Sequence, residues 1–260
     1  MAALIIPNEA FLSTSATTLD RTDSAPTPGS PEKAAVRSMF DRIAPRYDLL
    51  NRLLSGGVDT RWRRRAVDAL GLEGATRLLD LCTGTADLLI DALGRDGARR
   101  GVGIDLSSEM LVRGGRKLAR RGMAGRSGLA CGDGECLPLA SAAFDGALVS
   151  FGIRNVGRPE QALLELHRVL RPGGRLVILE FSMPAGLLGA IYRFYFGKVL
   201  PRIGGMVSGD PAAYAYLPAS VARFPTPASF AALLTSAGFE KVSVQPLTAG
   251  IAYIYRGEVA

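Results

Sequence analysis

Short apolar runs of strand length recur through the middle of this chain, and segments of helical length separate most of them. The runs lie at residues 77–82, 101–106, around Leu129, 144–151 and 175–181. Ser107 is placed to cap one of the intervening helices, and Pro159 fits the first turn of another. Parallel strands need long crossover connections, so strands that alternate with helices predict a parallel, doubly wound sheet.

Two further strands are expected near the C-terminus, at residues 239–244 and 251–256. A short turn containing Gly250 joins them, so they are expected to pair in the antiparallel sense. The sequence therefore predicts an α/β fold with a doubly wound, seven-stranded, mostly parallel sheet and an antiparallel C-terminal strand.

The chain of 260 residues is long enough for one large domain with appendages. Residues 1–32 are rich in Ser, Thr, Pro and Ala and are expected to form a disordered tail. Residues 33–260 are expected to form a single domain. Within it, residues 33–70 are predicted to be a helical lid, and residues 185–225 interrupt the alternation and are predicted to cover the substrate.

Composition narrows the classes of function that the chain can have. The three cysteines lack metal-ligand spacing and His167 is the only histidine, so no metal site is expected. No apolar run reaches the roughly 18 residues of a membrane span, and no signal peptide is recognisable, so a cytoplasmic location is expected. The net charge of +7 favours an anionic partner, although an arginine-rich proteome would give the same charge.

The segment LLDLCTGTADL (Leu78–Leu88) has the strand–turn–helix pattern with which nucleotide sites often begin. Asp80 lies at the end of its strand, Gly84 lies in its turn and Thr85 opens its helix. The carboxylate of Asp105, which ends the next strand, can accept both hydroxyls of a ribose. A pyrophosphate needs close backbone approach over several glycines, and this turn has one. S-adenosylmethionine carries an ammonium group that suits Asp80 and no phosphate, so it is preferred to NAD. For this loop alone, a packing turn with no ligand is the alternative.

A second acidic loop follows the third expected strand and weakens that alternative. In the segment Cys131–Asp145, Asp133 can accept a hydrogen bond from an adenine amino group, and Gly134 permits close approach. Two acidic loops at the carboxyl edge of one sheet favour a cofactor that contains a nucleoside.

The order of these motifs resembles that of the class I methyltransferases. Three longer segments are similar to the menaquinone/ubiquinone biosynthesis C-methyltransferase family: MFDRIAPRYDLLNRLLSGG (Met39–Gly57), SFGIRNV (Ser150–Val156) and RVLRPGGRLVILEFSMP (Arg168–Pro184). The resemblance extends from about residue 35 to residue 257 and implies a Rossmann-like fold with S-adenosylmethionine as the cofactor. The family's cofactor positions fall on Thr85, Asp105, Asp133, Gly134 and Ser150.

The first loop departs from the family's commoner form, because it has C-T-G-T-A-D in place of G-G-T-G-D. Two glycines are lost, at Thr83 and Ala86. The sequence therefore does not determine the conformation of this turn, although it does determine where the turn lies in the fold.

The resemblance implies C-methylation of the quinol ring of demethylmenaquinol to give menaquinol. The equivalent benzoquinol reaction of ubiquinone biosynthesis and a small-molecule O-methylation are the alternatives. A ring carbon becomes nucleophilic when the adjacent hydroxyl loses its proton, so the site must stabilise a phenolate. Arg154 is the first candidate for this role, with Asn155 to orient the hydroxyl, and Tyr47 on the lid is the second. The competing interpretations are a salt bridge from Arg154 to Glu180 and ordinary helix packing for Tyr47.

An isoprenoid quinol resides in the bilayer, so transient contact with the inner membrane face is expected. Residues 186–207 combine aliphatic and aromatic residues with three basic ones and are predicted to roof the quinol pocket and to enter the membrane interface. The alternative is a helix buried in the core or in a homodimer. Nucleic acid is not expected as a partner, because the fourth strand leads into SFGI and not into a D/N-P-P-Y/F motif, and no cysteine follows a proline.

Overall fold

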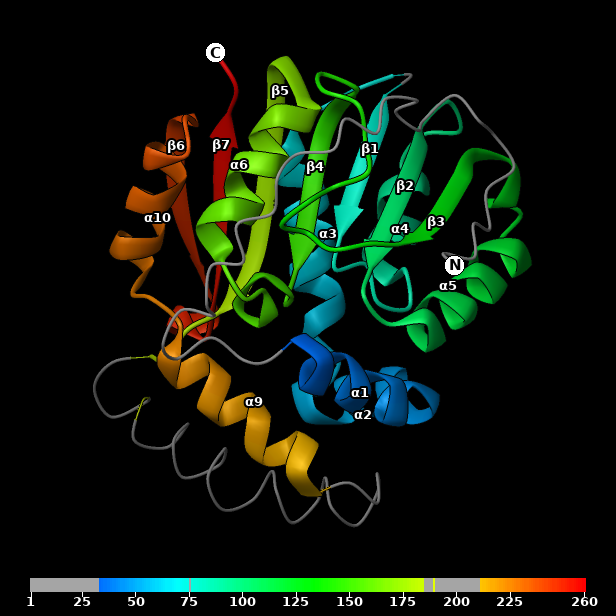
Figure 1. The fold of residues 1–260 in the computed structure, drawn as a ribbon, viewed down its shortest axis with the longest axis vertical. Helices are drawn as coiled ribbons and strands as arrows, with labels where there is room; N and C mark the ends of the chain where they lie inside the picture. Colours follow the sequence, from blue (N-terminus) through cyan, green and yellow to red (C-terminus); the bar gives the residue numbers. More distant parts are fainter. Residues whose placement is uncertain (1–32, 75, 185–188, 190–210) are drawn as a thin grey trace.

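The computed structural model describes residues 33–74, 76–184, 189 and 211–260 of the chain. Within these ranges a seven-stranded sheet carries helices on both faces (Figure 1). The strands are β1 (Arg77–Leu81), β2 (Arg100–Asp105), β3 (Ser127–Cys131), β4 (Phe144–Ser150), β5 (Leu170–Phe181), β6 (Glu240–Leu247) and β7 (Ala252–Glu258). The described helices include α1 (Lys33–Ile43), α2 (Tyr47–Ser55), α3 (Val58–Leu70), α4 (Asp87–Leu93), α5 (Ser108–Arg120), α6 (Pro159–Val169), α9 (Pro211–Arg223) and α10 (Pro227–Ser236), with short 3₁₀ turns that include η4 (Ile153–Asn155). No helix in these ranges is long and apolar enough to cross a membrane.

The strand order is β3-β2-β1-β4-β5-β7-β6. β1 pairs in parallel with both β2 and β4, and β7 alone runs antiparallel to its two neighbours, β5 and β6. The predicted doubly wound sheet with an antiparallel C-terminal strand is confirmed. The winding direction changes between β1 and β4, so a ligand is expected beyond the carboxyl ends of these strands.

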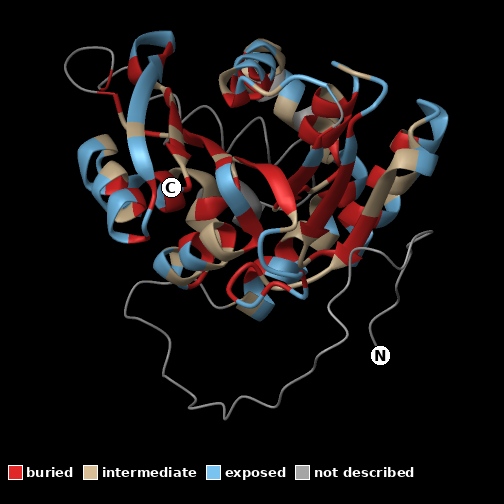
Figure 2. Ribbon diagram, turned by 90° about the horizontal axis from the view of Figure 1, so that it is seen from above, coloured by how far each residue is buried: buried red, intermediate tan, exposed pale blue. Residues whose placement is uncertain are grey.

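Two apolar layers hold the helices on the sheet. On one face, α6 and α10 pack against the strands through fully buried side chains such as Leu163 and Phe230. On the opposite face, α3 and α4 pack through Ala66 and Leu88. Figure 2 shows the buried residues gathered in the sheet and on the inner sides of the helices. Each large apolar side chain buried in these layers contributes roughly 1.5–3 kcal/mol to folding.

β5 begins at Leu170, whereas the sequence predicted a strand that starts at Arg175. Leu170 pairs with Phe144, and the register then shifts before Gly146 pairs with Arg175. The Pro-Gly-Gly segment that was expected to end the preceding helix therefore lies inside an irregular strand. Pairing with β4 on both sides of the irregularity keeps this segment in the sheet, and a local sequence pattern carries no sign of such pairing.

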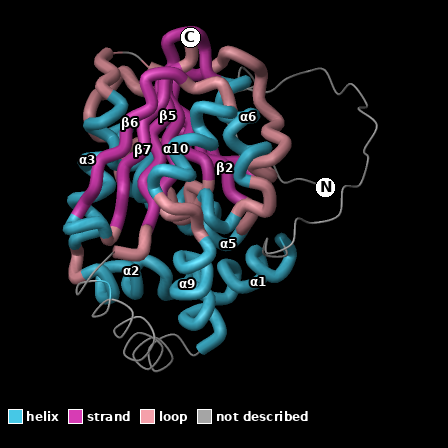
Figure 3. The backbone as a smooth tube through the Cα atoms, turned by 90° about the vertical axis from the view of Figure 1, so that its left-hand side faces the viewer, coloured by secondary structure: helices cyan, strands magenta, loops and turns pink. Residues whose placement is uncertain are grey.

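Three helices lie at the carboxyl edge of the sheet. α1, α2 and α9 sit below the strand ends in Figure 1, and the side view in Figure 3 places them at the same edge. α3, which the sequence grouped with the lid, packs on the sheet through Trp62 and Val67, so it belongs to the layer that covers the sheet. The predicted tail (residues 1–32) and nearly all of the predicted membrane segment (186–207) lie outside the described residues.

Candidate active site

The turn after β1 has a left-handed backbone at three alternate residues. Cys82, Gly84 and Ala86 have φ values of 57°, 54° and 64°. Glycine adopts this conformation without steric cost, whereas cysteine and alanine are strained in it by roughly 1–2 kcal/mol. The turn thus has a glycine-type conformation at Ala86, where the chain lacks the family's usual glycine.

Asp80 braces this turn from inside the protein. Its Oδ2 accepts hydrogen bonds from the Thr83 hydroxyl at 2.6 Å and from the Leu89 backbone amide of α4 at 3.1 Å. Asp80 is 1% exposed, and burial raises the pKa of its carboxyl to about 7. The carboxyl therefore ties the loop to α4, the helix that follows it. These hydrogen bonds are made in a loop that has Thr83 and Ala86 where the family commonly has glycine.

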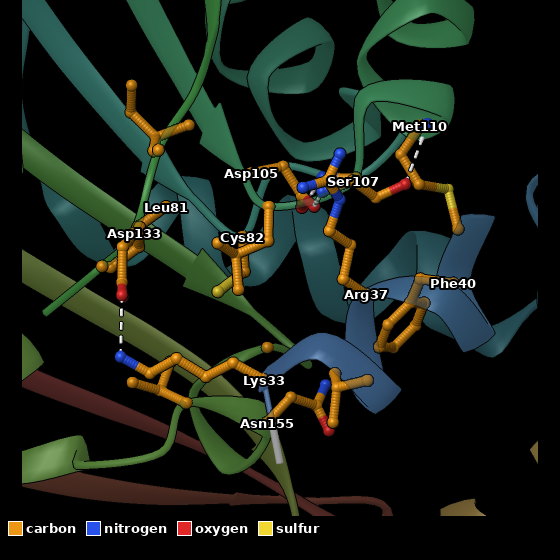
Figure 4. A pocket seen from close by; sticks show the side chains of 18 of the residues that line it. Lys33, Arg37, Phe40, Leu81, Cys82, Asp105, Ser107, Met110, Asp133 and Asn155 are labelled. Carbon is orange, nitrogen blue, oxygen red and sulfur yellow. Dashed lines mark hydrogen bonds and ion pairs between the residues drawn. The ribbon is translucent and has the colours of Figure 1, made fainter. Parts of the chain in front are cut away.

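A cavity open to solvent lies beyond β1, β2 and β4, where the strand order predicts a ligand, and its empty space is about 720 Å³ when the solvent at its mouth is included. Apolar side chains such as Leu81 and Ile104 form part of its wall, and Figure 4 shows polar groups from several elements around it. Seven of the ten predicted site residues line the cavity: Tyr47, Gly84, Asp105, Asp133, Gly134, Ser150 and Asn155.

Asp105 lies at the end of β2, as the sequence predicted for a ribose acid. Its Oδ2 accepts from the Gly84 backbone amide at 2.8 Å, and its Oδ1 accepts from the Ser107 amide at 2.9 Å. Burial raises the pKa of this carboxyl, and the two backbone donors offset part of that effect. The two amides fix the carboxylate at the cavity wall while its remaining lone pairs stay available to hydroxyl groups.

Asp133 lies on the loop after β3 and faces a cation that the sequence did not predict. Nζ of Lys33, at the start of α1, lies 2.7 Å from Oδ2 of Asp133 (Figure 4). The same Nζ lies 2.8 Å from Oε1 of Glu135. Glu135 is buried and also pairs with Arg158 at 2.8 Å. Beside them, a Cβ at Gly134 would lie 3.2 Å from the Leu81 side chain, so this loop packs closely on β1.

Ser150 ends β4 at the cavity wall. Its Oγ is buried and has no hydrogen-bond partner among the described residues. A buried hydroxyl without a partner costs roughly 1–3 kcal/mol, so this oxygen suits a polar ligand group in the cavity.

Thr85 does not reach the cavity, although the family resemblance implied a cofactor contact there. Its hydroxyl donates to Oδ1 of Asp48 at 2.6 Å and accepts from Nζ of Lys117 at 3.1 Å. Lys117 also pairs with Asp48 at 2.9 Å and with Asp87. Thr85 therefore joins the lid helix α2 to α4 and α5. Asp80 likewise lies outside the cavity wall, so direct contact between its carboxyl and a ligand is not supported.

Arg154 lies in the salt bridge with Glu180 that was the competing interpretation of this residue. Its Nη1 lies 2.6 Å from Oε1 of Glu180 and donates to the Phe151 carbonyl at 2.5 Å. The guanidinium carbon lies 5.5 Å from the centre of the Phe181 ring. Nη2 has no hydrogen-bond partner among the described residues. Arg154 is thus a firmly held cation beside the cavity and does not line it.

The residues of this site fit S-adenosylmethionine. The cofactor has several hydroxyl and amino donors and a sulfonium cation, and it lacks a pyrophosphate. Two carboxylates, Asp105 and Asp133, and an unpartnered hydroxyl, Ser150, line the cavity, while the loop lacks the glycine series that a pyrophosphate requires. The doubly wound sheet with an acid after β2 and another after β3 defines a class I S-adenosylmethionine-dependent methyltransferase.

Comparison with known proteins identifies the family within this class. The ubiE/COQ5 methyltransferase family model matches residues 29–258, and the chain belongs to this family, as the sequence resemblance implied. The chain is 50% identical over 222 residues to the "Ubiquinone/menaquinone biosynthesis C-methyltransferase UbiE" of Syntrophotalea carbinolica, which covers 85% of this chain and 92% of that protein. It is also 50% identical over 222 residues to the "Demethylmenaquinone methyltransferase" of Thermus thermophilus, which covers 85% of this chain and 99% of that protein.

A solved structure shows the same fold at low sequence identity. The phosphoethanolamine N-methyltransferase 2 of Haemonchus contortus, in complex with S-adenosyl-L-methionine, aligns with a TM-score of 0.62 and 13% identity. The alignment covers 89% of this chain and 60% of that one. Membership of the ubiE/COQ5 methyltransferase family, together with this fold, identifies the chain as a methyltransferase that uses S-adenosylmethionine, as predicted.

Sequence analysis missed the polar contacts that join α1 to the cavity wall. Lys33 reaches Asp133 across 100 positions, and the Ser107 hydroxyl donates to Oδ1 of Asp41 at 2.5 Å across 66 positions. No spacing rule links residues so far apart. The sequence predicted only that residues 33–70 form a helical lid, and it did not indicate which residues the lid contacts.

Proposed function

We propose that this methyltransferase transfers a methyl group to a ring carbon of demethylmenaquinol and so forms menaquinol. The observation that carries the proposal is the 50% identity to a protein named demethylmenaquinone methyltransferase, which extends over 99% of that protein. Methylation of the equivalent benzoquinol is the second candidate, because another relative at 50% identity carries ubiquinone as well as menaquinone in its name.

In this proposal, four residues of the cavity wall bind the cofactor. Asp105 accepts the ribose hydroxyls, Asp133 with Gly134 binds the adenine edge, and the free Ser150 oxygen takes a further polar group. Asp80 acts indirectly, because it shapes the loop. When bound, S-adenosylmethionine supplies an electrophilic methyl group on a sulfonium.

Arg154 stabilises the negative charge that develops on the quinol oxygen. Its Nη1 and Nε are engaged by Glu180, Phe151 and Ser220, which leaves Nη2 as its unpartnered donor among the described residues. A guanidinium keeps its charge at neutral pH, so Arg154 favours loss of the hydroxyl proton and does not itself accept that proton. Because its partners fix its position, little reorganisation is needed when the charge forms.

Tyr47 closes the cavity from the lid and donates a hydrogen bond toward the acceptor oxygen. Burial raises the pKa of its phenol, while Asn51 and the nearby Arg154 and Arg63 lower it. The net shift is upward, so the phenol stays protonated at neutral pH. We assign the lid role to α1 and α2 and a substrate-covering role to residues 185–225.

A methyl-transfer assay tests this function. The protein is incubated with S-adenosylmethionine labelled in its methyl group and with either reduced demethylmenaquinone or the matching benzoquinol, and the products are identified by mass spectrometry. Methylation at carbon of the naphthoquinol, faster than that of the benzoquinol, is expected. Methylation of oxygen, or of neither quinol, contradicts the proposal. An Arg154→Ala protein with full turnover contradicts the role of that residue.

The protein binds peripherally to the cytoplasmic face of the membrane in this proposal. A homodimer that does not bind the membrane is the alternative. Arg61, Arg64 and Arg65 are exposed on α3, and each basic group near an anionic surface contributes about 1 kcal/mol. Co-sedimentation with anionic vesicles at low salt is expected to exceed that of a variant with these arginines changed to glutamine. Equal sedimentation, or a dimer by light scattering that does not bind vesicles, argues against membrane contact.

A further inference from the structure

Two residues of α9 contact the last two residues of the η4 turn. The Tyr216 hydroxyl donates to Oδ1 of Asn155 at 2.9 Å, and Nε of Arg154 donates to the Ser220 hydroxyl at 3.3 Å. Tyr216 and Ser220 are four positions apart, so they lie on the same face of the helix. α9 therefore docks on the turn that carries two of the three residues proposed to act on the acceptor.

The contact with Tyr216 fixes the direction of the Asn155 carboxamide. A carboxamide has an accepting oxygen on one side and an NH₂ donor on the other. Because Oδ1 accepts from Tyr216, Nδ2 points away from it and lies 3.5 Å from the Phe151 carbonyl oxygen. This is the upper limit of a hydrogen bond, and the second N–H of Nδ2 has no partner among the described residues. Since Asn155 lines the cavity, a donor is available there.

Tyr216 acts through Asn155 and not on a ligand in the cavity. It is half-buried and is not among the described residues that line the cavity. Burial raises the pKa of its phenol, and the Arg154 charge lowers it by a smaller amount. The hydroxyl therefore keeps its proton at neutral pH and remains the donor to Oδ1.

We propose that Tyr216 is a positioning residue that holds the Asn155 carboxamide with its N–H groups toward the quinol oxygen. The inference rests on the proposed function, because it takes a quinol hydroxyl as the acceptor group. A donor stabilises that oxygen as it becomes negative, whereas a rotated amide would present its own oxygen and repel the charge. Arg154, the preceding residue of the same turn, lies beside the cavity, and its charge stabilises the same oxygen through space.

The Tyr216→Phe variant tests this assignment, since it removes one hydroxyl and keeps the ring. With saturating S-adenosylmethionine, kcat for reduced demethylmenaquinone is expected to fall about tenfold, because the amide is no longer held in one direction. The Kd of S-adenosylmethionine and the Tm are expected to stay unchanged. Tyr253→Phe removes the same hydroxyl from β7, at a residue that is not among those described as lining the cavity, so it is the matched control and is expected to keep full activity. An unchanged kcat in Tyr216→Phe overturns the assignment.

A double-mutant cycle separates positioning from simple anchoring of α9. If Tyr216 acts through Asn155, Tyr216→Phe has no further effect on kcat in an Asn155→Ala background. If the losses in kcat of the two single variants multiply in the double variant, Tyr216 only anchors α9, and the inference is overturned. A third variant, Asn155→Asp, keeps the acceptor for Tyr216 but replaces the donor with a carboxylate, so its kcat is expected to recover at acidic pH, where the carboxyl is protonated.

The same assay distinguishes failure of the inference from failure of the proposed function. A wild-type protein that methylates neither quinol contradicts the proposed function and, with it, the acceptor on which the inference rests. A wild-type protein that methylates the quinol while Tyr216→Phe matches it contradicts the inference alone.

Discussion

The ammonium of Lys33 lies 2.7 Å from the carboxylate of Asp133, the residue that the sequence predicts as an adenine acceptor. Lys33 begins α1, so this ion pair joins the lid directly to the candidate cofactor site. Its side chains are 40% and 35% exposed, so the pair is worth about 1 kcal/mol at most. A contact of this strength holds the lid in place but opens readily.

Replacement of Lys33 by methionine is therefore expected to loosen α1 without unfolding the domain. Amide hydrogen exchange in α1 should accelerate severalfold, because both Asp133 and Glu135 lose their link to the helix. Association and dissociation of S-adenosylmethionine, followed by stopped-flow fluorescence, should both become faster. Arg42→Met, on an exposed position of the same helix, is the control. Unchanged exchange and binding rates would show that the ion pair does not hold the lid.

The outline of the fold could be read from the sequence because its signals are local. Most of the strands are short apolar runs. Asp105 ends β2 and Asp133 lies two residues after β3, so the parallel sheet brings the two acids to one edge. The start of β5 at Leu170 could not be read, because it depends on pairing with Phe144 across a register shift.

The direction of individual side chains was the part of the site that sequence patterns could not supply. Thr85 lies in the predicted loop, yet its hydroxyl bonds to Asp48 on the lid and not to the cavity. A motif fixes the place of a residue on an element, whereas the partners of its side chain depend on segments that are distant in the chain. For Arg154, the pairing with Glu180 was foreseen as an alternative, and the structure has it.

The strained backbone at Ala86 predicts that this position tolerates glycine but not valine. Its φ of 64° suits glycine, so Ala86→Gly should change the free energy of unfolding by less than about 1 kcal/mol, since relief of strain offsets the lost rigidity. Ala86→Val should cost about 3 kcal/mol or more, because a β-branched residue is poorly accommodated at positive φ and Ala86 is fully buried near Gly114. Urea denaturation of both variants measures the difference. Equal costs for glycine and valine would contradict the left-handed conformation.

Asp80 predicts a pH dependence of stability. Burial raises the pKa of its carboxyl from 3.8 to about 7, so folding favours the protonated form. The stability that this group contributes is complete below pH 3.8 and is lost as pH rises through about 7. Relative to an Asp80→Asn variant, the wild-type free energy of unfolding should fall by up to a few kcal/mol over this range. Asp68→Asn, whose side chain is 60% exposed, is the control. Wild-type and Asp80→Asn curves that run parallel from pH 5 to 8 would rule out the shift.

Tyr255 offers a site where stability can be gained. Its side chain is fully buried beneath Phe230, and its hydroxyl has no hydrogen-bond partner among the described residues. Tyr255→Phe removes an unsatisfied polar atom and keeps the ring, so the free energy of unfolding should rise by about 1 kcal/mol. Thermal denaturation tests this against Tyr253→Phe, the neighbouring tyrosine on the same strand. A loss of stability in Tyr255→Phe alone would mean that the hydroxyl has a partner, such as a buried water.

The pair of Arg154 and Glu180 predicts an asymmetry between its two single variants. Both side chains are almost fully buried, at 7% and 0% exposed, and removal of one charge leaves the other uncompensated. In Glu180→Gln the guanidinium cannot lose its charge, so the free energy of unfolding should fall by about 3 kcal/mol. In Arg154→Met the remaining carboxyl can take up a proton, since burial already raises its pKa, so the loss should be smaller and should grow with pH.

The double variant Arg154→Met/Glu180→Gln separates stability from activity. It removes both buried charges, so it should recover most of the stability lost in Glu180→Gln, because a buried ion pair replaced by neutral groups costs little. It should not recover methyl transfer, because the cation proposed to stabilise the charge on the quinol oxygen is gone. Glu160→Gln, at an exposed position on α6, controls for the loss of one carboxylate. If the double variant regained turnover together with stability, Arg154 would serve only to neutralise Glu180, and the cation that stabilises the phenolate would have to be another residue.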